Sequence, residues 1–162
     1  MVQNSAKHLI IGGGIIGCSI AYHLSRMGEK DVCLLERANL TEGATWHAAG
    51  LVGQLRSSRN TTRMLKKSVE MYDRLQLQEG LKFDWKKTGS LRLAATKERM
   101  LEARRLATMA RSFDLEMHII SPSEAKQLFP LIEQNGLEGA AFIPSDGYVD
   151  PASLCQAIAG AA

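Results

Sequence analysis

A glycine-rich turn between two short apolar segments is the feature that most constrains the fold of this chain. Residues 8–11 (HLII) are too few for a helix and are typical of a buried parallel strand, and they lead directly into residues 12–17, GGGIIG. Residues 32–35 (VCLL) predict a second buried strand that ends at Glu36. Between them we expect a helix that stops at Gly28. This helix should pack on the sheet through an apolar stripe made of Ile16, Ile20, Leu24 and Met27.

The glycines of the turn follow the pattern G-x-G-x-x-G, in which each glycine has a separate physical function. Gly12 makes the tight turn, Gly14 lets the backbone approach a pyrophosphate, and Gly17 lets helix and strand pack closely. The start of the helix offers free N–H groups and a partial positive charge to phosphates. Glu36 stands about 20 residues past Gly17, the spacing of an acid that binds a ribose hydroxyl. Because all these parts occur in order, the sequence predicts a dinucleotide site rather than an ordinary glycine-rich turn.

Composition and charge limit which other functions the chain could have. The chain has 162 residues, is 45% hydrophobic and carries a net charge of +3, so it can bury a core but shows no excess charge for nucleic acid. Its three cysteines lack C-x-x-C spacing and are expected to be buried apolar residues in a reducing compartment, and no metal site is predicted. The apolar residues 9–21 are too few to span a membrane. The short polar stretch before residue 7 leaves no room for a leader, which favours the cytoplasm; the mitochondrial matrix is the alternative if a leader has been removed.

The rest of the chain predicts alternating helices and strands. We expect helices over residues 61–79 and 97–113, two strands over 83–87 and 90–95 joined across Thr88-Gly89, and a short strand over 117–120. Ser121 and Glu124 form a capping box for a short helix, and Asp150 caps a last one.

Five basic residues form a cluster between these segments. Two readings are open, a solvated helix face, which is favoured, and a surface that attracts anions; the residues are Arg56, Arg59, Arg63, Lys66 and Lys67.

Five segments in this order resemble the N-terminal part of the dimethylglycine dehydrogenase and sarcosine dehydrogenase group of D-amino-acid-oxidase-like flavoproteins. The segments are GGGIIG, LLER, GATWHAAGLVGQLR, KTGSLRLA and FIPSDGYVDP. GGGIIG is common to many flavin and nicotinamide enzymes, whereas TWHAAGLVGQLR is far more specific. The resemblance covers nearly the whole chain.

The resemblance implies FAD, with its adenosine half on the glycine turn and Glu36 and its isoalloxazine near residues 45–50. The cofactor-binding residues expected on this basis are Gly12, Gly14, Ile15, Ile16, Gly17, Glu36, Arg37, Gly43, Thr45, Trp46, His47, Ala49, Gly50 and Leu51. It also implies oxidation of an N-methyl amine, such as an N-methylated glycine, by hydride transfer to flavin N5. The iminium product is then hydrolysed or trapped as a one-carbon unit. Folate binding belongs to a C-terminal region of the family that these residues do not match.

Two residues are candidates for specific chemical roles. In the family, the histidine after this tryptophan is bonded to the 8α-methyl of the flavin, which assigns a covalent link to His47. That chemistry needs a neutral imidazole, a form that histidine commonly takes near pH 7. Arg56 follows the flavin loop closely and matches a substrate carboxylate with its planar two-pronged donor. An equally favoured alternative is that Arg56 belongs to the solvated basic face and binds no substrate.

The fold class predicted is α/β, the N-terminal part of a doubly wound FAD/NAD(P)-binding fold with an inserted α+β segment of the substrate domain. The domain boundaries expected are 1–56 for the βαβ unit and flavin loop, 57–149 for the inserted segment and 150–162 for a helix that returns to the cofactor domain. A single βαβ unit is short for such a fold, so we expect the N-terminal portion of a longer protein.

Three other functions fit the same residues. One is an FAD-dependent amine oxidase that passes electrons to oxygen, because the sequence leaves the electron acceptor open. Another is a non-catalytic regulatory protein that keeps the fold. The third is a nicotinamide-binding module, because Glu36 suits the ribose of NAD as well as that of FAD.

Overall fold

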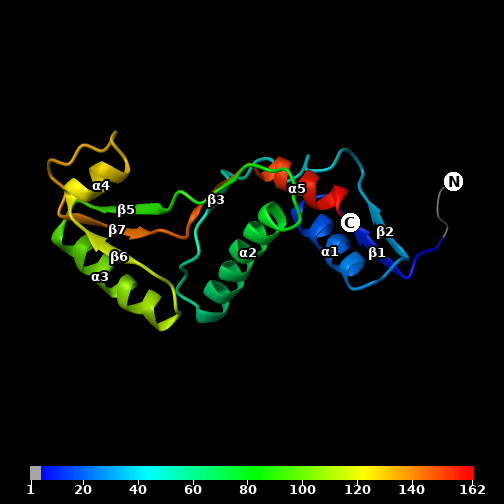
Figure 1. The fold of residues 1–162 in the computed structure, drawn as a ribbon, viewed down its shortest axis with the longest axis horizontal. Coiled ribbons are helices and arrows are strands. Elements are labelled where there is room, and N and C mark those ends of the chain that lie inside the picture. The colour runs from blue at the N-terminus through cyan, green and yellow to red at the C-terminus, as the bar shows by residue number, and fades with distance from the viewer. Residues whose placement is uncertain (1–4) are drawn as a thin grey trace. The chain divides into compact units, whose positions relative to one another are not determined.

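The computed structural model describes residues 5–162. Its helices and strands (Figure 1) are, in chain order, β1 (His8–Ile11), α1 (Ile15–Arg26), β2 (Val32–Leu35), β3 (Leu51–Val52), α2 (Arg59–Leu77), β4 (Trp85–Lys86), β5 (Ser90–Ala94), α3 (Lys97–Ser112), β6 (His118–Ile120), α4 (Pro122–Leu128), β7 (Gly139–Ile143), β8 (Gly147–Val149) and α5 (Pro151–Gly160).

The chain divides into two compact units. The first contains residues 5–51, 72–85 and 148–162, and the second contains 52–71 and 86–147. The division falls within α2 and within β3, β4 and β8, three short strands that form one sheet in the order β3-β8-β4. The domain boundaries that the sequence predicts, after residues 56 and 149, stay a prediction.

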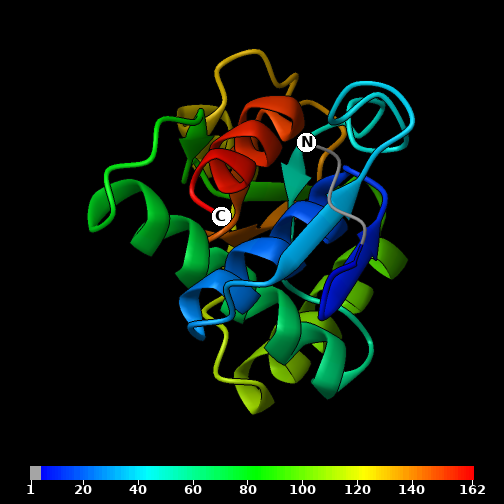
Figure 2. The same cartoon turned by 90° about the vertical axis from the view of Figure 1, so that its right-hand side faces the viewer.

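The first unit begins with the predicted βαβ motif (Figure 2). β1 and β2 pair in parallel, with His8 opposite Val32 and Ile11 opposite Leu35. Ile10 is buried beneath α1, where it lies close to Gly17. Leu9 and Ile11 point the other way and are 57% and 83% exposed. The expectation that both faces of these strands are buried is therefore wrong for the described residues: α1 covers one face, and the other has no cover among residues 5–162.

The buried face of α1 differs from the one that the apolar stripe predicts. Ile16 and Met27 are 75% and 79% exposed, whereas Gly17, Cys18 and Tyr22 are buried. Small residues allow the helix to approach the strands and α5 closely, and this close packing determines which side faces inward. Cys18 of α1 and Cys155 of α5 meet there, fully buried, with both thiols directed at the carbonyl of Gly13.

The last turns of α2 and the segment after them complete the first unit. Leu75 is fully buried, and the hydroxyl of Tyr22 donates to the Glu79 carboxylate at 2.8 Å. Asp150 caps α5, as predicted, by accepting from the N–H of Ser153 at 2.8 Å. The hydrogen bond from Tyr22 to Glu79 thus joins α1 to the segment after α2.

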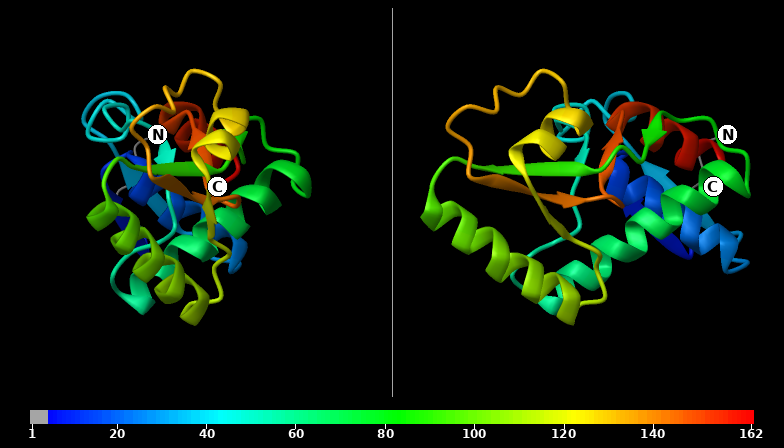
Figure 3. Two further views of the ribbon diagram at one scale, coloured as in Figure 1. Left: turned by 90° about the vertical axis from the view of Figure 1, so that its left-hand side faces the viewer. Right: turned by 60° about the vertical axis from the view of Figure 1, so that its left-hand side comes forward.

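The second unit is an antiparallel sheet of order β5-β7-β6 between two helices (Figure 3). Ile143 of β7 packs with Ala110 of α3 on one face, and Ala140 packs with Ala125 of α4 on the other. Side chains alternate along a strand, so residues three apart lie on opposite faces and the sheet is covered on both. The capping box of α4 is present, as Ser121 and Glu124 predict.

Three strands of the structure were not predicted from the sequence: β3, β7 and β8. β7 is the central strand of its sheet and pairs with both β5 and β6. The two strands expected around Thr88-Gly89 do form, as β4 and β5, but they belong to different sheets and do not pair. No helix among residues 5–162 is long and apolar enough to cross a membrane.

Candidate functional site

The glycine turn between β1 and α1 has the backbone geometry that its sequence predicts. Gly12 has φ of +110°, a conformation that side chains disfavour, and its N–H donates to the carbonyl of Leu35 at 2.8 Å. A Cβ on Gly17 would lie 1.9 Å from the carbonyl oxygen of Gly12, which no substitution can accommodate without moving the backbone. The first glycine thus makes the turn and the last permits close packing of the helix.

The N-terminus of α1 has no capping side chain of its own. Gly14 is the N-cap and makes no side-chain cap, and the first turn contains no acidic residue. One of the free donors, the N–H of Ile15, is bound by the hydroxyl of Thr45 at 3.0 Å. A Cβ on Gly14 would lie 3.0 Å from this hydroxyl. Donors and the positive end of the helix dipole therefore remain available to an anionic group at the turn.

Glu36 lies beside the turn, at the end of β2. One of its carboxylate oxygens accepts from the N–H of Gly13 at 2.7 Å and the other from the N–H of Ala38 at 3.1 Å. These two hydrogen bonds, in that order of strength, lower the pKa of the Glu36 carboxyl, so it is an anion at neutral pH. A carboxylate has further lone pairs, which leaves it able to accept from ribose hydroxyls.

Thr41 is a residue of this site that the sequence did not reveal. Its φ is +77°, unusual for threonine, and its N–H donates to the carbonyl of Gly13 at 3.0 Å. Its own carbonyl accepts from the N–H of Trp46 at 3.3 Å. Thr41 thus fastens the loop of residues 39–50 to the glycine turn. A positive φ at threonine leaves no sequence signal, because glycine is the residue that usually marks such a position.

Trp46 and His47 form an exposed pair of rings on this loop. Their centroids are 4.3 Å apart, and the Trp46 ring N–H donates to the carbonyl of Glu42 at 3.2 Å. Nδ1 of His47 lies 3.0 Å from the carbonyl oxygen of Gly43. Because a carbonyl oxygen only accepts, this contact assigns the hydrogen of a neutral ring to Nδ1 and leaves the lone pair on Nε2.

The structure brings some of the predicted site residues together and leaves others apart. Gly12, Gly14, Ile15, Glu36 and Thr45 surround the glycine turn through the contacts above. Gly50 has φ of +73° and packs against the carbonyl of Val149. The other predicted residues of the first unit are exposed. Ile16 belongs to the turn itself, whereas no hydrogen bond to the turn is found within residues 5–162 for Arg37, Gly43, Ala49 and Leu51.

Arg56 lies in the second unit, at the end of the segment that follows β3. Its side chain is exposed, and one guanidinium nitrogen donates to the carbonyl of Leu55 at 2.8 Å. It borders a small cavity of about 260 Å³ whose lining also includes Arg92 and the apolar Leu106 and Met109. Guanidinium groups and apolar side chains thus share the lining of this cavity.

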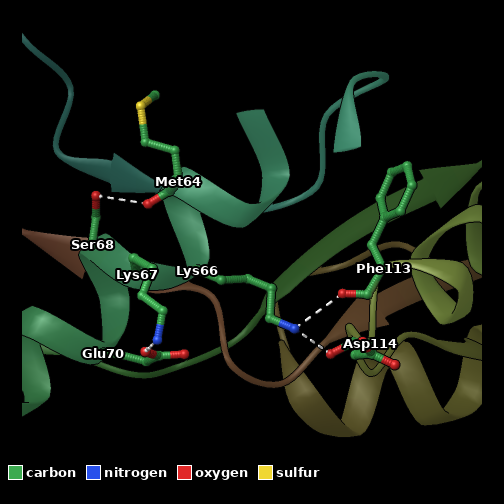
Figure 4. Close-up of polar contacts among 7 residues, drawn as sticks. All are labelled: Met64, Lys66, Lys67, Ser68, Glu70, Phe113 and Asp114. Atoms are coloured by element: carbon green, nitrogen blue, oxygen red, sulfur yellow. Dashed lines mark hydrogen bonds and ion pairs between the residues drawn. The ribbon is translucent and has the colours of Figure 1, made fainter. Parts of the chain in front are cut away.

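Four residues of the basic cluster, Arg59, Arg63, Lys66 and Lys67, lie on α2 and line a cavity of about 570 Å³. Lys66 donates to the carbonyls of Phe113 and Asp114, at the end of α3, and Lys67 pairs with Glu70 (Figure 4). These two lysines therefore have partners within the second unit, and both interpretations of the cluster stay predictions. Among the described residues, no group of three or more His, Cys, Asp or Glu side chains is placed to hold a metal ion.

The residues around the glycine turn fit a dinucleotide. A side chain at position 17 would fill the space that the packed helix needs, and no described atom lies within 4 Å of the Cβ position of Gly12. The uncapped start of α1 supplies donors for a pyrophosphate, and the Glu36 carboxylate supplies an acceptor for a ribose.

Known proteins resemble nearly the whole chain in sequence and in structure. Residues 7–162 match the family model described as FAD dependent oxidoreductase. The chain is 39% identical to the human mitochondrial sarcosine dehydrogenase over 99% of its length and 39% identical to the rat mitochondrial dimethylglycine dehydrogenase over 97%. It spans 18% of the length of each of these relatives.

Among solved structures, the L-proline dehydrogenase from P. horikoshii superposes with a TM-score of 0.92 at 29% identity. That match covers 99% of this chain and 42% of the other. The α/β fold and the predicted resemblance are thereby confirmed. The family model matches residues 7–162, from the residue before β1 to the last residue of the sequence. The chain therefore belongs to the family of FAD-dependent oxidoreductases.

Proposed function

We propose that this chain holds the ADP half of FAD in an oxidoreductase of N-methylated amines. The observation that carries the proposal is the glycine turn with its surroundings: left-handed Gly12, closely packed Gly17 and the uncapped start of α1. In this proposal the N–H groups at the start of α1 bind the pyrophosphate, and Glu36 accepts from the ribose hydroxyls. The anionic Glu36 also keeps its hydrogen bond to Gly13, which holds the turn in shape.

The substrate class that we infer is an N-methylated glycine, such as sarcosine or dimethylglycine. Identity of 39% to two dehydrogenases named for these amines, along nearly the whole chain, supports this choice. When bound, FAD supplies the acceptor for the hydride equivalent that leaves the N-methyl carbon. The acceptor that takes the electrons from the reduced flavin is not assigned, and an oxidase that uses oxygen is the alternative. The named relatives are mitochondrial, which supports the mitochondrial alternative to a cytoplasmic location.

His47 is the residue that we propose for covalent attachment. The carbonyl of Gly43 holds the ring hydrogen on Nδ1, so Nε2 has the lone pair that a bond to carbon requires. The ring is exposed and lies on the loop that Thr41 and Thr45 fasten to the glycine turn. The neighbouring Trp46 ring limits the directions in which the imidazole can turn.

Arg56 is the residue that we propose for the substrate carboxylate. Its guanidinium can form two parallel hydrogen bonds with a carboxylate, and the bond to Leu55 uses only one of its five N–H donors. No described acid forms an ion pair with it within residues 5–162. Folate binding is expected only of the family's C-terminal region, which these residues do not match.

The proposal is tested by following the flavin on the natural full-length protein. Denatured and separated on a gel, the wild-type polypeptide should keep yellow fluorescence, and His47→Ala should lose it. His118→Ala is the matched control, because His118 is also exposed but lies on β6 and pairs with Glu116. Fluorescence kept by His47→Ala would place the link on another residue. A native protein that contains no flavin would contradict the FAD assignment itself and favour a regulatory or nicotinamide-binding role.

A further inference from the structure

Asp146 is a buried carboxylate in the second unit that the proposed function does not yet use. It is 2% exposed and lies between β7 and β8. No ion pair to it occurs in the part of the chain that the structure describes, so its charge is balanced by hydrogen bonds alone. A buried carboxylate without a cation needs several hydrogen bonds to offset the cost of removing it from water.

Three donors hold this carboxylate, and they come from two other segments of the chain. One oxygen accepts from the backbone N–H of Gln54 at 3.0 Å and from its side-chain amide at 2.9 Å. The other oxygen accepts from the hydroxyl of Ser90 at 2.6 Å. Gln54 is itself 3% exposed, and its amide also donates to the hydroxyl of Ser145 at 2.7 Å. The position of Gln54 is thus determined by Asp146 through both its backbone and its side chain.

The same segment is held a second time two residues later. The hydroxyl of Thr62, which is fully buried, accepts from the N–H of Arg56 at 3.0 Å and donates to the carbonyl of Arg56 at 3.1 Å. Asp146 and Thr62 therefore fix the backbone on both sides of Leu55. Arg56 leaves this segment from a defined backbone position rather than from a free loop.

Asp146 and Arg56 both lie near Gly53. A Cβ on Gly53 would lie 3.7 Å from a carboxylate oxygen of Asp146 and 3.8 Å from a guanidinium nitrogen of Arg56. Both groups are therefore within 4 Å of one point beside a residue that has no side chain. Opposite charges in the same neighbourhood attract each other, which favours orientations of Arg56 that face Asp146.

We propose that Asp146 is a positioning residue for carboxylate recognition by Arg56. It acts through the backbone of Gln54 and through its charge, and it does not contact the substrate. This inference rests on the proposed function, in which Arg56 binds the carboxylate of an N-methylated glycine. The inference adds a residue that holds Arg56 in place before the substrate binds. A guanidinium that is already held loses less conformational entropy on binding a carboxylate than a free one.

The test is a double-mutant cycle in the natural full-length protein. Asp146→Asn keeps an oxygen that can accept from Gln54 but removes the charge, so the fold should be retained. We expect it to raise the KM for dimethylglycine or sarcosine by about tenfold with kcat nearly unchanged, an effect of the size found for coupled neighbours. In an Arg56→Ala background the same change should leave KM unaltered. Ser145→Ala, which removes only one partner of the Gln54 amide, is the matched control and should leave KM near the wild-type value.

Each outcome separates the inference from the function on which it rests. Equal effects of Asp146→Asn with and without Arg56 would show a purely structural carboxylate and overturn the inference. No effect of Asp146→Asn, while Arg56→Ala still raises KM, would overturn the inference and leave the role of Arg56 intact. Equal losses from Arg56→Ala for amines with and without a carboxylate would remove the role of Arg56. Absence of flavin reduction by any N-methyl amine would instead contradict the proposed function.

Discussion

The hydroxyl of Thr45 accepts a hydrogen bond of 3.0 Å from the amide nitrogen of Ile15, thirty residues earlier in the chain. This bond joins the loop that carries His47 to the first turn of the helix that faces the pyrophosphate in the proposed site. Thr45 is 8% exposed, so water does not readily replace it. The two ends of the cofactor site in the first unit are therefore connected by one side chain.

Thr45→Val should weaken FAD binding about five- to tenfold. The change keeps the shape of the side chain but removes the acceptor, which costs about 1–1.5 kcal/mol for a partly buried hydrogen bond. Flavin fluorescence titration of apoprotein in a His47→Ala background measures this without interference from a covalent link. Thr108→Val, on the exposed face of α3, should leave the affinity unchanged. An unaltered affinity in Thr45→Val would show that the loop is held by other contacts.

Gly17→Ala should prevent normal FAD loading and lower the thermal stability. The added Cβ would lie 1.9 Å from the carbonyl oxygen of Gly12, so the glycine turn must move. Gly160→Ala is the control, because nothing lies within 4 Å of its Cβ position and alanine favours a helix. Flavin content and melting temperature, measured on both variants, check the prediction. Full loading of Gly17→Ala would mean that the turn is more adaptable than its geometry indicates.

The stability that Cys155 contributes should disappear at high pH. Burial, followed by the hydrogen bond to Cys18, raises the pKa of the Cys155 thiol from 9.0 to about 12, because the neutral thiol is favoured in the folded state. The unfolded chain ionises first, so this contribution is complete below about pH 9 and is lost as the pH rises from 9 to about 12. The stability should fall steadily across that range, because the unfolded chain loses a proton that the folded chain keeps.

Thermal melts of wild type and Cys155→Ala at pH 8 and pH 10 measure this effect. The difference in melting temperature between the two proteins should shrink at the higher pH, while titrations of other groups cancel in the comparison. A constant difference would show that the thiol does not titrate in the unfolded state as expected.

Arg56→Ala should weaken binding of carboxylate-bearing amines selectively. Loss of a charge-assisted hydrogen bond to the substrate carboxylate is expected to cost about 1.5–3 kcal/mol. Amines that lack a carboxylate should bind as they do to the wild-type protein. Steady-state KM values for both kinds of amine provide the comparison, and a uniform loss would assign Arg56 to the structure of the second unit.

Local patterns in the sequence predicted the parts of the fold that local forces determine. The βαβ motif, the capping box at Ser121 and the cap at Asp150 depend on neighbours a few residues away, and all are present. The glycines of the turn could be assigned because backbone conformation and close packing both require them. Glu36 could be placed because the apolar run of β2 ends directly before it.

Features that depend on distant parts of the chain were missed or misjudged. β7 reads GAAFI, and Gly and Ala have weak strand preference. The strand is nevertheless central, because β5 and β6 pair with its two edges while Ala140 packs against α4 on one face and Ile143 against α3 on the other. The buried side of α1 was misjudged because its small residues, and not Ile16 and Met27, allow close approach. Gln54 and Asp146 are 92 residues apart, and no local pattern predicts such a pair.

The most direct test of the central proposal is anaerobic reduction of the flavin in the natural full-length protein. Purified protein should be yellow, and addition of dimethylglycine or sarcosine without oxygen should bleach its visible flavin absorbance, whereas glycine should not. Bleaching confined to N-methylated glycines would support both the cofactor and the substrate class. A protein without flavin, or a bound flavin that no N-methylated amine reduces, would contradict the proposal.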